Sequence, residues 1–121
     1  MHDATGPRGE VLLLERSAAV VAPLAVALRC RGLLVDEVTD LFAARAAFMA
    51  RGGHDALVVA PDVPVAIARE VAAALREVDP RVEIVVFGEH GLGMVGERRV
   101  RGLHPAAPVA CGAVVKALAD P

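Results

Sequence analysis

Short apolar runs alternate with longer, mixed segments along this chain. The runs at 11–14, 56–60 and 82–87 contain almost no polar residue. Runs of this length without polar–apolar alternation are typical of strands that are buried on both faces of a sheet. The segments between the runs are long enough to form helices. This alternation indicates an α/β domain in which a parallel sheet lies between two layers of helices.

The helical segments carry end signals of their own. Ser17 is a good N-cap for the first helix, and Gly32 ends it. In the second segment, Phe42, Ala46 and Met49 recur at helical spacing. The predicted helices cover 18–31, 41–51, 65–78 and 108–119, and the predicted strands cover 11–14, 33–38, 56–60, 82–87 and 98–103.

Chain length and strand count limit the architecture. The chain has 121 residues, which is enough for one domain. Residues 1–9 are polar and contain Gly and Pro, and we predict a disordered tail there, followed by a single domain at 10–121. Five parallel strands in this length predict a flavodoxin-like, doubly wound fold with the strand order 2-1-3-4-5.

Composition argues against several functions. The formal net charge is −2 and 2% of the residues are aromatic, so the chain lacks the basic and stacking surface of a nucleic-acid binder. No apolar run approaches the roughly 18–20 residues that span a bilayer, and no signal segment begins the chain, so we expect a cytoplasmic protein. Cys30 and Cys111 have no metal or redox spacing. No nucleophile–base pair stands out, and we expect no metal, no cofactor and no enzymatic activity.

Four sequence blocks, in their order and spacing, resemble the receiver domain of bacterial two-component response regulators. The blocks are VLLLERS at 11–17, CRGLLVDEVTD at 30–40, HDALVVAPDVP at 54–64 and LREVDPRVEIVVFGEHG at 75–91. The resemblance implies a bacterial regulatory domain with the fold predicted above. Residues 88–104 are fewer than the corresponding region of the family, so we expect its fourth helix to be shortened or missing.

The resemblance also assigns the positions that carry the family's chemistry. Receivers accept a phosphoryl group on an Asp five residues after the Asp that begins the third strand, and counting from Asp55 leads to Ala60. An acidic pair after the first strand binds Mg²⁺ in the family, and the matching residues are Glu15 and Arg16. A guanidinium at this position opposes cation binding.

Two further positions of the family's site are also changed. Gly88 stands where a Thr or Ser follows the fourth strand, and His104 stands where a Lys precedes a Pro. The sequence therefore predicts a degenerate receiver, or pseudo-receiver, that works without phosphorylation. Asp62 is open to two interpretations, a displaced acceptor or a carboxylate of the loop that precedes a helix, and we favour the loop residue.

The first and last predicted helices lack the polar stripe of a surface helix. Residues 18–28 contain no charge, and residues 108–119 contain only Lys116. Because contiguous apolar surface often marks a partner site, we predict protein contacts there, with a partner protein or in a dimer. An Ala-rich composition without a partner is the other explanation. The predicted interface consists of Val20, Val21, Leu24, Val109 and Val114.

A glycine-rich segment supports an alternative function. Residues 91–96 spell G-x-G-x-x-G after a strand, a pattern that cradles dinucleotides when it follows the first strand of a βαβ unit. Here it follows the fourth strand, and too little chain remains for a second nucleotide-binding half. The alternative is a small-molecule or nucleotide-binding regulatory domain that uses the loop from Gly88 to Gly96. A simple loop that replaces a helix explains the same residues.

Overall fold

Five parallel strands form a single sheet in the order β2-β1-β3-β4-β5. The computed structural model describes residues 9–88, 90–100 and 109–119. The strands are β1 (Glu10–Leu14), β2 (Leu34–Val38), β3 (Ala56–Val59), β4 (Glu83–Phe87) and β5 (Arg98–Val100).

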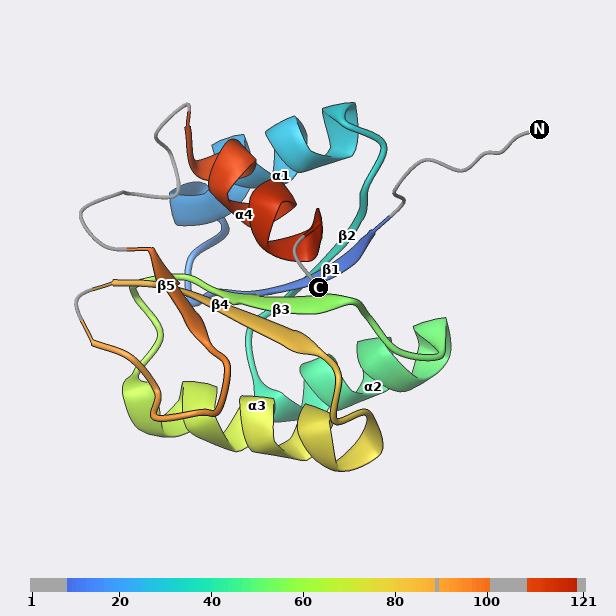
Figure 1. The fold of residues 1–121 in the computed structure, drawn as a ribbon, viewed down its shortest axis with the longest axis vertical. Helices are drawn as coiled ribbons and strands as arrows, with labels where there is room; N and C mark the ends of the chain where they lie inside the picture. Colours follow the sequence, from blue (N-terminus) through green and yellow to red (C-terminus); the bar gives the residue numbers. More distant parts are fainter. Residues whose placement is uncertain (1–8, 89, 101–108, 120–121) are drawn as a thin grey trace.

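Helices cover both faces of this sheet (Figure 1). They are α1 (Ala18–Cys30), α2 (Leu41–Arg51), α3 (Val65–Val78) and α4 (Ala110–Ala119). Helices α1 and α4 contact each other on one face, and α2 and α3 contact each other on the opposite face. The arrangement confirms the predicted flavodoxin-like fold and its strand order.

The segment between β4 and β5 differs most from a complete doubly wound fold. Its described residues, 88 and 90–97, contain no helix, as expected from its short length. The predicted fifth strand at 98–103 is observed as far as Val100, and residues 101–103 lie outside the described residues. The predicted tail at 1–9 also lies outside them, except for Gly9.

The core lies on both sides of the central strands. Every residue of β3, and every residue of β1 after Glu10, is buried. This burial explains why these strands read as unbroken apolar runs. The largest buried side chains are Phe48 of α2 and Phe87 of β4, which pack into the same hydrophobic cluster as the strands.

The expected exposure of the predicted interface is wrong for three of its residues. Val21 and Val114 are 0% exposed and Leu24 is 1% exposed, so all three lie in the core. On α1, the buried residues recur three to four positions apart and include Ala25 and Leu28, which is the spacing of one helix face. The sheet packs against one apolar face of α1, and the side chains of these buried residues form that face.

Candidate functional site

Residues that follow two neighbouring strands, β1 and β3, meet at the carboxyl edge of the sheet. The Glu15 N–H donates to the Val38 carbonyl at 3.0 Å, and the Ala60 N–H donates to the Leu14 carbonyl at 2.9 Å. These bonds continue the ladders of β1 with β2 and β3 beyond the strand ends. They bring Glu15 and Ala60 to the same edge, where ligands bind in open α/β sheets.

Glu15 is a buried carboxyl group at this edge. It is 2% exposed, and its Oε1 has no hydrogen-bond partner among the described residues. Burial raises the pKa of Glu15 from 4.5 to about 7, the carboxylates of Glu37 and Asp62 add to this rise, and Arg29 opposes it. In the folded chain, Glu15 therefore binds its proton more tightly than an ordinary glutamate.

Asp62 holds two loops together. Its Oδ2 accepts the Ser17 N–H at 3.0 Å, and its Oδ1 accepts the Arg16 N–H at 3.4 Å. Both donors lie just before α1, where backbone N–H groups lack partners within the helix. These contacts agree with the interpretation of Asp62 as a loop residue. Arg16 itself is an exposed residue of the loop between β1 and α1.

The two other described positions of the family's site carry no reactive group. Ala60 is 1% exposed and presents only a methyl group. Gly88 has a φ of 139°, a conformation that side-chain-bearing residues rarely adopt, so a Thr or Ser would be strained there. His104, the residue at the Lys position, lies outside the described residues.

A small apolar cavity lies beside these residues. Its volume is about 80 Å³. The side chains around it are mostly hydrophobic, and they include Val63, Val86, Phe87 and Leu92 next to Ala60. A phosphoryl group needs donors and cations around it, and this lining offers few.

The edge does not fit a divalent cation. Within the described part of the chain, no three His, Cys, Asp or Glu side chains gather closely enough to hold a metal ion. Mg²⁺ binds through carboxylate oxygens, and the methyl group of Ala60 supplies none. Asp62 is turned toward the backbone before α1.

The glycine-rich loop is closed by its own carboxylate. The Glu97 carboxylate accepts the N–H of Leu92 at 2.9 Å and the N–H of Met94 at 2.8 Å. A Cβ at Gly91 would lie 2.0 Å from Glu97 Oε2, so the glycine is needed for this close approach. Arg76 of α3 donates to the Val95 carbonyl and fixes the loop from outside. Two of the loop's backbone donors are thus already used.

Comparison with known proteins reveals similarity at the level of structure. No protein-family model and no curated protein matches the chain. A response regulator receiver protein from Sinorhizobium medicae WSM419 is 20% identical with a TM-score of 0.70, over 93% of this chain and 92% of that chain. The chain has the fold of receiver domains.

Two other solved structures support the same fold. The chemotaxis response regulator CheY4 of Vibrio cholerae is 16% identical with a TM-score of 0.68, over 93% of this chain and 99% of that chain. HP1043, an orphan response regulator of H. pylori, is 15% identical with a TM-score of 0.70, over the same shares. No helix among the described residues of this receiver fold is long and apolar enough to cross a membrane.

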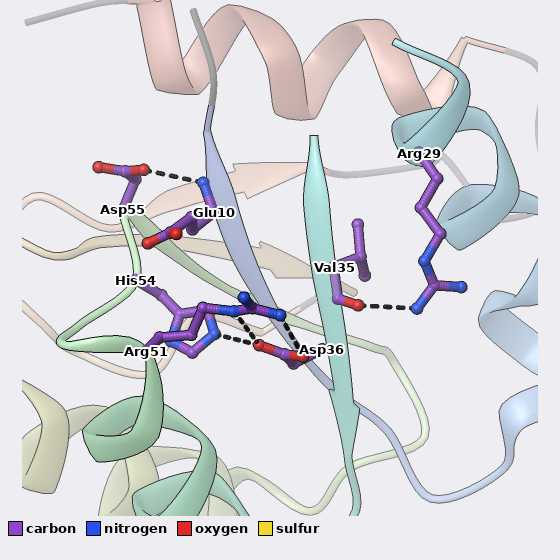
Figure 2. Close-up of polar contacts among 7 residues, drawn as sticks. All are labelled: Glu10, Arg29, Val35, Asp36, Arg51, His54 and Asp55. Carbon is purple, nitrogen blue, oxygen red and sulfur yellow. Dashed lines mark hydrogen bonds and ion pairs between the residues drawn. The ribbon is translucent and has the colours of Figure 1, made fainter. Parts of the chain in front are cut away.

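Sequence reasoning missed a polar cluster near the amino ends of the strands. Figure 2 shows that Arg51 and His54 both point toward Asp36 of β2. Arg51 Nε and His54 Nε2 lie 2.9 and 2.7 Å from Asp36 Oδ2, and the Arg51 hydrogen bond holds the pKa of Asp36 below its usual value. His54 is buried and stacks on Phe48.

This cluster has a structural role. It joins the end of α2 and the start of β3 to β2, and nearby the Asp55 carboxylate accepts the Glu10 N–H at 2.8 Å (Figure 2). No sequence motif indicated the cluster, because Asp36 lies 15 residues from Arg51 and 18 from His54. Only the fold brings these residues together.

Proposed function

We propose that the chain is a receiver-like regulatory domain that acts through protein contacts without being phosphorylated. The buried methyl group of Ala60 is the observation that carries the proposal, because this residue occupies the family's acceptor position. A methyl group cannot accept a phosphoryl group. Asp62, the nearest carboxylate in sequence, is engaged by the backbone of Arg16 and Ser17.

Loss of the acceptor is accompanied by loss of its supporting groups. Phosphoryl transfer depends on an acceptor, a cation and charge-neutralising donors that act together. Arg16 replaces one carboxylate of the acidic pair, and Gly88 offers no hydroxyl. These changes support a receiver-like domain that binds other proteins without being phosphorylated.

Helices α1 and α4 remain the proposed contact surface, now without the buried Val21, Leu24 and Val114. Val26 of α1 is 59% exposed, and Val109, just before α4, is 63% exposed. Val20 is half-buried at the edge of the core. Contact there with a second copy or with a partner protein would bury apolar surface that carries few charges.

Beryllofluoride, a phosphoryl mimic, tests the absence of a phosphate site. We expect Mg²⁺ and beryllofluoride to leave the amide NMR signals of Glu15, Ala60 and Asp62 unchanged, since Ala60 supplies no acceptor oxygen. A receiver with an intact acceptor Asp serves as the positive control. Saturable shifts at these residues would show a relocated phosphate site and contradict the proposal.

The nucleotide-binding alternative has less support. Two of its loop donors, the N–H groups of Leu92 and Met94, are occupied by Glu97. We expect isothermal titration with ATP, GTP and NAD to show no binding. Saturable binding that a Gly93→Val substitution abolishes would favour the alternative instead, because Gly93 has a φ of 77° in this loop.

A further inference from the structure

Helix α2 presents an apolar stripe that nothing in the described structure covers. Phe42 is 84% exposed and Met49 is 64% exposed. Exposed Ala46 lies between them, so the three residues follow one another at helical spacing on a single face. We call this face, together with Arg45, the α2 stripe; its residues line a shallow hollow with Leu41.

The fold does not need this stripe. The opposite side of α2 supplies Ala44 and Phe48 to the core. The helix ends are fixed separately, since Asp40 accepts the Ala43 N–H at 2.7 Å and Gly52 closes the last turn in a left-handed conformation. Exposing an aromatic ring of this size is unfavourable without a partner.

The charges of α2 constrain what can cover the stripe. The helix contains two arginines and no acidic residue. Arg51 is paired with Asp36 through two hydrogen bonds, of 2.9 and 3.1 Å. Arg45 is exposed beside Phe42 and Ala46 and makes no ion pair within the described residues. The stripe therefore combines apolar surface with one uncompensated positive charge.

A second copy of the chain fits this surface poorly. In a symmetric dimer the same patch meets itself, so Arg45 would face Arg45 across the axis without an acidic residue of α2 to separate them. The stripe spans about 10 Å from Phe42 to Met49.

We propose that the α2 stripe docks an amphipathic helix of a partner protein that carries apolar side chains on one face and a carboxylate opposite Arg45. Two to three turns of such a helix match the length of the stripe. Its apolar side chains would pack between Phe42 and Met49 over the small Ala46, in the manner of helix-in-groove recognition. The stripe lies on the opposite side of the sheet from α1 and α4 (Figure 1), so this proposal is independent of the contact surface proposed above.

Two synthetic peptides test the proposal. Each has about 18 residues, or five helical turns, with the same leucine face; one carries Glu and the other Lys beside the leucines. We expect the Glu peptide to shift the amide NMR signals of Phe42, Ala46 and Met49 saturably. Phe42→Ser should weaken this binding about tenfold or more, and Val26→Ser on the other side of the sheet is the matched control.

Charge reversal at Arg45 distinguishes specific recognition from nonspecific hydrophobic binding. Arg45→Glu should reverse the preference, so that the Lys peptide binds more tightly than the Glu peptide. Equal binding of both peptides, no shift around α2, or shifts confined to another surface would overturn the proposal. So would self-association, or binding to vesicles of anionic lipid, that Phe42→Ser abolishes, because the stripe would then serve a second copy or a membrane.

Discussion

Glu15 makes stability depend on pH in an unusual direction for a carboxyl group. Its folded-state pKa of about 7 exceeds the ordinary 4.5, so the folded chain binds the proton more tightly than the unfolded chain. The resulting stabilisation is fully present below pH 4.5 and is lost as the pH rises through 7. From pH 4.5 to pH 8 this contribution falls by about 3 kcal/mol.

Urea unfolding at several pH values measures this effect. Glu15→Gln removes the ionisation, so its free energy of unfolding should not show the decline above pH 5 that the parent chain shows. Glu70→Gln, on the exposed side of α3, is the matched control and should behave like the parent. If the free energy of unfolding declined equally above pH 5 in Glu15→Gln and in the parent, Glu15 would not be the group that holds the proton.

Individual residues differ in how far sequence alone could place them. Ala60 was found through the resemblance to receiver domains, in which the acceptor lies five residues after the Asp that begins the third strand, here Asp55. The role of Glu97 was not predicted, since its carboxylate reaches Leu92 and Met94 only in the folded loop. In the sequence, the signal for this contact was the short spacing of three residues between Met94 and Glu97.

At the scale of elements, charged residues decide whether a helix face can be predicted. Arg69, Glu70 and Glu77 mark the wet side of α3, and the apolar face between them is buried as the pattern indicates. Helix α1 carries no charge before Arg29. Several faces were equally apolar, so the sequence could not indicate that Val21 would point toward the sheet.

Two valines of α1 test this assignment. Val21→Glu should reduce the free energy of unfolding by at least about 3 kcal/mol, because it places an unpaired charge in the core. Val26→Glu should leave stability within about 0.5 kcal/mol of the parent, since this side chain is exposed. Circular dichroism during urea unfolding compares the two. Equal loss of stability would mean that Val26 is also part of the core.

Helix α2 shows the same ambiguity with a different result. Phe42, Ala46 and Met49 have the spacing of a buried face, yet Ala44 and Phe48 are the residues that pack inward. Both faces are apolar, and the sheet can cover only one of them. The sequence therefore predicted the helix and its bounds but not the exposed stripe.

At the scale of the whole molecule, the sheet separates two apolar surfaces of different character. The surface of α1 and α4 carries Val26 and Val109 among small residues, whereas the α2 stripe carries Arg45. A second copy meets little charge repulsion on the first surface. Strand order and layers were predictable because the apolar runs and chain length leave few alternatives, but the use of each surface depends on side-chain exposure.

Self-association should therefore involve α1 and α4 and not α2. We expect sedimentation velocity of the parent chain to show a concentration-dependent dimer, and Val26→Glu to shift it to monomer by placing like charges in the buried interface. Phe42→Ser, on the opposite side of the sheet, is the matched control and should leave the dimer unchanged. A dimer that resists Val26→Glu but is lost in Phe42→Ser would exchange the roles of the two surfaces. A chain that stays monomeric at every concentration would contradict self-association, and the surface of α1 and α4 would then bind only a partner protein.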